Sequence, residues 1–281
     1  WRDRPAAAPA VAGAGLLGSE IETPLARRLF ATTLTPASPG WLGEHRVQGR
    51  VVLPAAGFAA MALAAGAGPL GATEIAALLE VSEDGVAVQT AVAEDGTVTV
   101  HARTPDGWCR HATLAPGRAA TLGGLDIEAL RARCGEPVDA EAFYGRMADD
   151  GIALGPSFRL LSDIRAGDGE AMAQVRLAAP DGDGPVAAPL LDAMFQTLGA
   201  VLQRSDAPGH LPTGFDGLAV DRVVLGESGE LWCHARLRDG TAGALVGDLT
   251  LARADGAAVV RVDGLVCKPV AAGEAVRRHL Y

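Results

Sequence analysis

A histidine and an aspartate, His45 and Asp192, are the side chains of this sequence best suited to exchanging protons with a substrate. His45 is followed by Gly49 four residues on and by Pro54 nine residues on, a pattern written HxxxGxxxxP. Asp192 stands in an apolar run from Leu190 to Phe195, although aspartate is rarely buried unless it is paired. Apolar surroundings favour the neutral form of both groups. A neutral imidazole and a protonated carboxyl at the same pH are the base and the acid that general acid–base catalysis needs.

Each residue also has a structural interpretation. A lone histidine is more often a hydrogen-bonding residue than a catalyst, and Asp192, three residues after Pro189, could be an acid in the first turn of a helix. Two observations favour proton transfer. His45 lies on a loop just ahead of a strand at residues 50–53, and catalytic side chains concentrate on such loops. Asp192 and Gln196 stand four residues apart, so in a helix the amide can orient the carboxyl.

Between the histidine and the aspartate lies the segment Gly155-Pro156-Ser157-Phe158. These pieces, in this order, resemble the dehydratase domains of modular polyketide synthases and fatty acid synthases, and the resemblance spans residues 22–270. It implies that His45 is the general base, that Asp192 is the general acid and that Gln196 orients Asp192. It also implies that the Gly155 amide donates a hydrogen bond to the thioester carbonyl of the substrate and that Pro156 fixes the turn. The substrate-binding residues that it implies are Gly155, Pro156, Leu154, Gly49, Pro54, Leu211, Pro212 and Phe215.

The sequence departs from this family at two positions. The family usually has a tyrosine before Gly-Pro, as YGPxF, and this chain has Leu154 there. The segment from Leu211 to Phe215 resembles an LPxxW-like family segment, with phenylalanine in the aromatic place. We expect this segment to line the substrate tunnel.

The activity implied is that of a hydro-lyase: syn-type elimination of water from a 3-hydroxyacyl thioester, giving an α,β-unsaturated acyl chain. The substrate would be carried on the phosphopantetheine arm of an acyl carrier protein. The resemblance also implies neighbouring synthase domains as partners and a homodimer within the synthase. Two alternatives stay open. One is other acyl chemistry in the same fold, such as isomerisation, oxa-cyclisation or thioester hydrolysis; the other is an inactive structural module.

Composition narrows the class of protein. The 281 residues carry a net charge of −10, which argues against a nucleic-acid partner, and no apolar run makes a convincing membrane span. The four cysteines are scattered without metal-ligand spacing, so we expect a reduced cytoplasmic protein with no metal and no cofactor of its own. Residues 1–20 are rich in alanine, proline and glycine and are predicted to be an interdomain linker in a longer polypeptide.

The remaining chain is predicted to form two similar halves, residues 21–130 with the histidine and residues 131–275 with the aspartate. Each half has one mostly apolar helix, at 55–66 and 189–203, which should be buried. Short Asp-Gly turns predict antiparallel hairpins. The family resemblance then implies an α+β double hotdog with a tunnel between the two helices. Short helices are predicted at 127–133 and 140–149, and strands at 22–34, 50–53, 85–93, 97–103, 108–115, 158–164, 170–177, 217–225, 231–237, 244–252 and 259–269.

Overall fold

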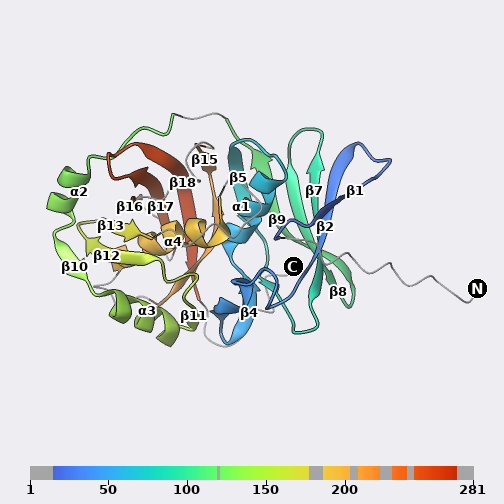
Figure 1. The fold of residues 1–281 in the computed structure, drawn as a ribbon, viewed down its shortest axis with the longest axis horizontal. Helices are drawn as coiled ribbons and strands as arrows, with labels where there is room; N and C mark the ends of the chain where they lie inside the picture. Colours follow the sequence, from blue (N-terminus) through green and yellow to red (C-terminus); the bar gives the residue numbers. More distant parts are fainter. Residues whose placement is uncertain are drawn as a thin grey trace, which may run out of the picture.

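A long antiparallel sheet forms the body of the protein (Figure 1). The computed structural model describes residues 15–118, 121–176, 186–202, 208–221, 230–238 and 244–270. Within these residues the sheet has 14 strands, in the order β1-β2-β7-β8-β9-β5-β14-β18-β17-β16-β13-β12-β10, and β15 pairs with β18 and β5 beside this path. Every strand pair in it is antiparallel, as the Asp-Gly turns predicted.

The first half supplies six strands of this sheet. Its hairpin between β7 and β8 turns at Asp95-Gly96, where Asp95 accepts a hydrogen bond from the Thr97 amide at 2.9 Å and Gly96 has φ +84°. The glycine adopts this left-handed conformation without the steric cost that a side chain would add. The strands are β1 (Ser19–Ile21), β2 (Arg27–Leu34), β5 (Leu70–Ile75), β7 (Val86–Ala93), β8 (Val98–Thr104) and β9 (Gly107–Pro116).

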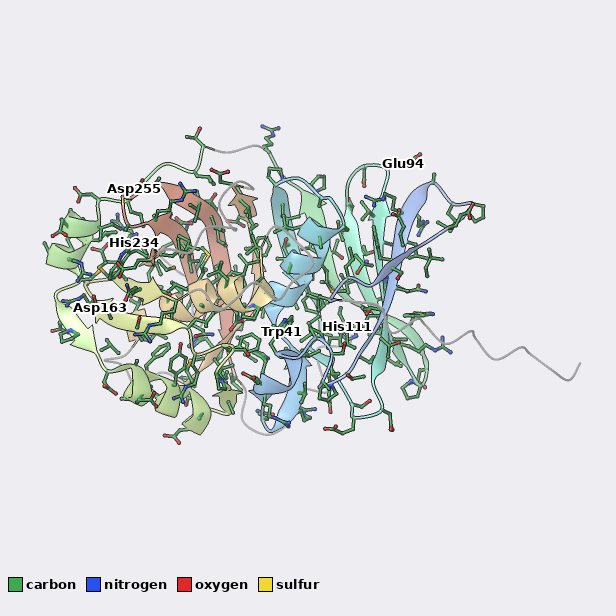
Figure 2. All side chains as sticks on the ribbon, viewed as in Figure 1. Trp41, Glu94, His111, Asp163, His234 and Asp255 are labelled. Carbon is green, nitrogen blue, oxygen red and sulfur yellow. The ribbon has the colours of Figure 1, made fainter. Side chains whose placement is uncertain are left out.

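The second half supplies the other eight strands. Its hairpin between β17 and β18 repeats the same turn chemistry: Asp255 accepts from the Ala257 amide at 2.9 Å, and Gly256 has φ +85°. Figure 2 shows that the turns carrying Glu94 and Asp255 lie toward the same upper edge of the molecule. The hairpin predicted at residues 239–240 lies outside the described residues. The strands are β10 (Glu136–Val138), β12 (Leu161–Ala166), β13 (Glu170–Val175), β14 (His210–Phe215), β15 (Gly217–Val220), β16 (Leu231–Leu237), β17 (Leu245–Arg253) and β18 (Ala258–Pro269).

Two buried helices lie in the centre of the molecule, one from each half. In α1 (Ala55–Ala64) every residue from 56 to 63 is buried, and in α4 (Ala188–Gly199) every residue from 188 to 198 is buried. The two helices pack against each other (Figure 1). This confirms the prediction that neither helix has a face toward water. No helix of the described residues is long and apolar enough to cross a membrane.

A small second sheet carries one end of the site. It has the order β11-β3-β4-β6, formed by β11 (Ile152–Leu154), β3 (His45–Val47), β4 (Arg50–Leu53) and β6 (Leu79–Glu80). Three of these strands come from the first half, whereas β11 follows helix α3 (Ala140–Asp149) of the second half. The halves are therefore joined by this sheet and, in the main sheet, by the pairing of β5 with β14 and β15.

The structure shifts two predicted boundaries. Leu16 and Leu17 are buried in the core and β1 begins at Ser19, so the folded part starts before the predicted end of the linker at residue 20. The predicted division between residues 130 and 131 falls inside α2 (Ile127–Arg133). Leu130 of α2 packs with Trp232 of the second half, so we place the division ahead of this helix.

Candidate active site

His45 occupies the first position of β3, directly after a short 3-10 helix at Leu42–Glu44. The side chain is buried, with 6% of its surface exposed, and its Nδ1 lies 2.8 Å from the carbonyl oxygen of Val52. A carbonyl only accepts, so Nδ1 carries a proton and donates it to this oxygen. The ring packs against Phe158, with 5.2 Å between the centroids, and Phe158 packs edge-on against Trp41. These contacts fix the orientation of the imidazole ring.

Gly49 of the HxxxGxxxxP pattern forms the turn that brings Val52 back to His45. Strands β3 and β4 are joined by two residues, Gln48 and Gly49, which both have positive φ, at 49° and 78°. This is the geometry of a type I′ hairpin turn, whose second position glycine fills well. Gly49 is not among the residues that line the cavity beside His45. Its predicted contact with substrate is therefore replaced by a structural role.

Asp192 is the fifth residue of α4 and is 6% exposed. The helix begins at Ala188 and has no acidic residue in its first turn, so the interpretation of Asp192 as a first-turn acid is wrong. Burial raises the pKa of this carboxyl; the nearby His45 and the hydrogen bond from Gln196 act in the opposite direction. The raised pKa favours the protonated acid, as expected for a residue that gives up a proton.

Gln196 contacts the carboxyl as its spacing predicted. Its Nε2 donates to Asp192 Oδ2 at 2.7 Å and to the carbonyl oxygen of Phe158 at 3.1 Å. The glutamine side chain is buried. One residue thus links the acid on α4 to the segment whose ring supports His45.

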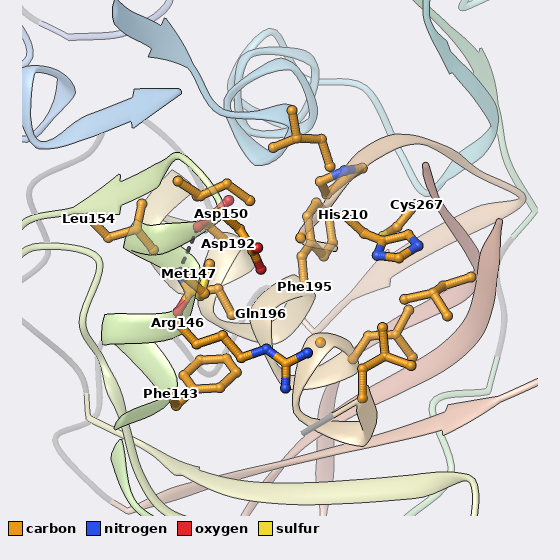
Figure 3. A pocket seen from close by; sticks show the side chains of 18 of the residues that line it. Phe143, Arg146, Met147, Asp150, Leu154, Asp192, Phe195, Gln196, His210 and Cys267 are labelled. Carbon is orange, nitrogen blue, oxygen red and sulfur yellow. Dashed lines mark hydrogen bonds between the residues drawn. The ribbon is translucent and has the colours of Figure 1, made fainter. Parts of the chain in front are cut away.

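His45 and Asp192 line the same cavity. Figure 3 shows Asp192, Gln196 and Phe195 of α4 beside this cavity, with Arg146 and Met147 of α3 on one side and His210 and Cys267 on the other. A smaller recess, lined by Val52, Pro54, Ala55 and Phe58, reaches the same pair from the side of α1. The full lining of the larger cavity is His45, Phe143, Arg146, Met147, Asp150, Ile152, Leu154, Asp192, Phe195, Gln196, Leu198, Gly199, Leu202, Pro208, Gly209, His210, Leu211, Pro212, Leu245 and Cys267.

Two recesses lie where a single tunnel between the two central helices was predicted, and both are lined by His45, Asp192, Leu211 and Pro212. Only the smaller recess lies beside α1, whereas the larger cavity lies between α3, α4 and β14. Three polar residues of its lining, Arg146, Asp150 and His210, were not predicted from the sequence. Arg146 lies on a helix of mixed polar and apolar composition, and His210 stands in no recognisable sequence motif. In the structure, His210 Nδ1 lies 2.7 Å from the carbonyl oxygen of Pro208.

Gly155 does not have the role that the resemblance implied. Its amide donates to the carbonyl oxygen of Glu44 at 2.8 Å, so this N–H is not available to a thioester. The Glu44 carboxylate also accepts from the Ser157 amide at 2.6 Å. A side chain on Gly155 would meet the Cβ of Glu44 at 2.7 Å. Gly155 and Pro156 are absent from the cavity lining and instead anchor the residue that precedes His45.

The other predicted substrate contacts divide into two groups. Leu154 lies opposite His45 in the pairing of β11 with β3 and lines the larger cavity. Leu211 and Pro212 line both cavities, and Pro54 lines the smaller one. Phe215 is buried in β14, opposite Thr73 of β5, and does not line either cavity. The expected tunnel position of Phe215 is therefore wrong.

Among the described residues, no group of three or more histidine, cysteine, aspartate or glutamate side chains is arranged to hold a metal ion. Burial raises the pKa of the Cys267 thiol, which lines the cavity, to about 12. A thiol with such a pKa is neutral and a poor nucleophile near neutral pH.

Comparison with known proteins agrees with this geometry. The model described as polyketide synthase dehydratase N-terminal domain matches residues 123–276, and the model described as polyketide synthase dehydratase domain matches residues 15–105. The chain is 33% identical to polyketide synthase GfsE of Streptomyces halstedii, covering 98% of this chain and 8% of that protein. It is 32% identical to the spectinabilin polyketide synthase system protein NorA' of Streptomyces orinoci, covering 87% of this chain and 7% of that protein.

Solved dehydratase domains share the fold. The dehydratase domain of a mycocerosic acid synthase-like polyketide synthase superposes with a TM-score of 0.82 at 25% identity, covering 92% of this chain and 98% of that one. The dehydratase domain from the CurF module of curacin polyketide synthase gives 0.80 at 24% identity, covering 92% and 100%. These matches confirm the double hotdog. The chain belongs to the polyketide synthase dehydratase family.

Proposed function

We propose that this domain eliminates water from a 3-hydroxyacyl thioester. The observation that carries the proposal is the shared cavity of His45, whose Nδ1 is held by the Val52 carbonyl, and Asp192, whose pKa is raised by burial. One group can accept a proton at the pH at which the other can donate one. A capping aspartate or a structural histidine has no need of this complementary pairing.

In this reaction His45 Nε2 takes the proton from C2 of the substrate. The electron pair of the broken C–H bond forms the new double bond between C2 and C3, and the C3–O bond breaks. Asp192 gives its proton to the departing hydroxyl, which leaves as water. The imidazolium then returns a proton to Asp192 through solvent. We propose that proton and hydroxyl leave from the same face of the substrate, in a syn elimination, with both groups lining one cavity.

The negative charge that develops on the thioester oxygen needs a donor other than Gly155. We propose the amide of Ala55, the first residue of α1, which lines the recess beside His45. The first amides of a helix have no partner within the helix, and the positive end of the helix dipole favours a negative charge there.

The proposed substrate carrier and partner domains are inferred from the much longer polyketide synthases that this chain resembles. The chain spans 8% of GfsE and 7% of NorA', so in such a protein it would be one domain among many. We propose that the acyl chain arrives on the phosphopantetheine arm of an acyl carrier protein, that the domain needs no cofactor of its own, and that it works in a homodimeric synthase in the cytoplasm.

The test is mass spectrometry of carrier-bound 3-hydroxyacyl thioesters of several lengths after incubation with the purified domain. We expect loss of one water from at least one substrate, and no loss with His45→Ala. The same spectra separate the alternatives. Release of a free acid would indicate thioester hydrolysis, and conversion of an enoyl substrate without a change of mass would indicate isomerisation or cyclisation. An unchanged substrate throughout the panel would favour the inactive structural module.

A further inference from the structure

Tyr144 of α3 makes a buried hydrogen-bond chain that ends at Asp192. The tyrosine is 5% exposed. Its hydroxyl oxygen accepts from the Leu161 amide at 3.0 Å, and the hydroxyl donates to Gln196 Oε1 at 3.2 Å. Gln196 Nε2 in turn donates to Asp192 Oδ2 at 2.7 Å. Tyr144 is not among the residues that line either cavity, so it does not touch the substrate space itself.

The direction of these hydrogen bonds is determined by which groups can donate and which can only accept. The Phe158 carbonyl only accepts, so the Gln196 atom 3.1 Å away from it must be Nε2, which donates. The other end of the amide, Oε1, then faces Tyr144. An amide oxygen only accepts, so the hydroxyl must donate to it. Tyr144 and Phe158 together thus exclude the flipped amide, which would place an oxygen against the Phe158 carbonyl.

The orientation of the amide has a consequence for the acid. The atom that donates to Asp192 Oδ2 is an N–H, so Oδ2 acts as the acceptor, a role that the carbonyl oxygen of a neutral carboxyl fills better than its hydroxyl oxygen. The proton of the neutral carboxyl is therefore placed on Oδ1. An undirected carboxyl would share the proton between both oxygens and rotate more freely, which lowers the fraction of molecules ready for proton transfer.

Tyr144 is itself held in place. The Arg159 guanidinium lies 4.8 Å from the centre of its ring and pairs with Glu141 at 2.9 Å, and the Phe143 ring packs edge-on at 5.2 Å. Burial raises the pKa of Tyr144, so the phenol stays a neutral donor. The other titratable groups that influence Asp192 or are influenced by it are His45 of β3 and Cys267 of β18.

We propose that Tyr144 is a positioning residue for the dehydration, acting through Gln196 to direct the proton of Asp192 onto Oδ1. This rests on the proposed function. The variant that tests it is Tyr144→Phe, which removes only the hydroxyl. We expect kcat to fall by about five- to thirty-fold, the factor that about 1–2 kcal/mol represents, with KM little changed because Tyr144 does not line the cavity.

The pH profile gives a readout that a purely structural role would not move. The Gln196 hydrogen bond lowers the pKa of Asp192, so loosening the amide should raise that pKa. Because Asp192 must be protonated to act, the alkaline limb of kcat/KM should shift to higher pH in Tyr144→Phe. The matched control is Thr197→Val, which removes a buried hydroxyl on α4. This hydroxyl donates to the Ala193 carbonyl oxygen at 3.0 Å and also contacts Cys233. The control variant should leave the profile in place.

A double variant decides whether Tyr144 acts through Gln196. In a Gln196→Ala background, Tyr144→Phe should cause no further loss of kcat, because the residue that carries its effect is gone. A full further loss, or a wild-type profile in the single variant, would overturn the proposal. Infrared titration of the Asp192 carboxyl, identified by its absence in Asp192→Asn, needs no turnover: a midpoint unchanged by Tyr144→Phe would also overturn it. A wild-type protein that dehydrates no substrate would instead contradict the proposed function alone.

Discussion

Replacing Asp192 by asparagine should stabilise the protein while it removes the acid. The carboxyl is 6% exposed, and within the described residues only Gln196 donates to it, at Oδ2. Ionising it leaves a desolvated charge with one hydrogen bond, whereas asparagine is neutral at every pH. Poor satisfaction of a buried polar group costs about 1–3 kcal/mol. We therefore expect Asp192→Asn to be more stable by roughly that amount near pH 8.

The sign of the pH dependence follows from the raised pKa of Asp192. Between the ordinary value of 3.8 and the raised value, the folded protein binds more protons than the unfolded chain. The free energy of unfolding of the wild type should therefore fall as pH rises through this window, and the difference from Asp192→Asn should vanish as pH falls below the ordinary value. The rate should fall by about 10²–10⁴, the usual contribution of a general acid.

The measurement is the melting temperature from pH 4 to pH 9, in which each kcal/mol corresponds to roughly 2–4 °C. Asp139→Asn is the matched control: Asp139 caps α3 from the surface, and asparagine caps equally well. If Asp192→Asn were less stable than wild type at pH 8, the carboxylate would be paired with a charged His45, since breaking a buried ion pair destabilises by about 3–5 kcal/mol. The assignment of a neutral base and a neutral acid would then be wrong.

Two further variants and two chemical treatments test the site. His45→Ala should fold and lose turnover by about 10²–10⁴, measured as water loss by mass spectrometry; retained turnover would remove the histidine from the mechanism. Leu154→Tyr should fold and keep or raise the rate, by up to roughly tenfold, because Leu154 lies opposite His45 and lines the cavity. A loss with a long substrate but not with a short one would show instead that leucine makes room for the chain. Activity should survive EDTA and thiol-blocking reagents, because the pair supplies both proton transfers; loss that a divalent ion restores would contradict the mechanism.

Elements encoded by local pattern were predictable from the sequence. The two central helices are mostly apolar, and the Asp-Gly hairpins at residues 95–96 and 255–256 close as an aspartate followed by a left-handed glycine allows. The i, i+4 contact of Asp192 with Gln196 likewise needs only a helix. In each case the residues that determine the structure lie within one or two turns of each other.

Strands β5 and β14 were not predicted, because their identity depends on their partners. Both contain glycine, and β14 also has a proline, which normally argue against a strand. In the structure Gly214 approaches Thr73 so closely that a Cβ would lie 2.3 Å from the Thr73 carbonyl oxygen. The missing side chain is what lets the two halves join at this point. The engagement of the Gly155 amide by Glu44 is similarly a contact between residues far apart in the chain.

These contacts between distant residues show that the two halves of the chain build the site together. The strand that begins with His45 pairs on one side with β4 of its own half and on the other with β11 of the second half, where Leu154 is its direct partner. Phe158, four residues beyond Leu154, packs on the His45 ring and accepts a hydrogen bond from Gln196, the residue that orients Asp192. The segment from residue 152 to 158 therefore holds both members of the pair. His45 lies in the first half by sequence and is held there by the Val52 carbonyl, but its ring also packs on Phe158 of the half that carries Asp192, so both halves contribute to the placement of the pair.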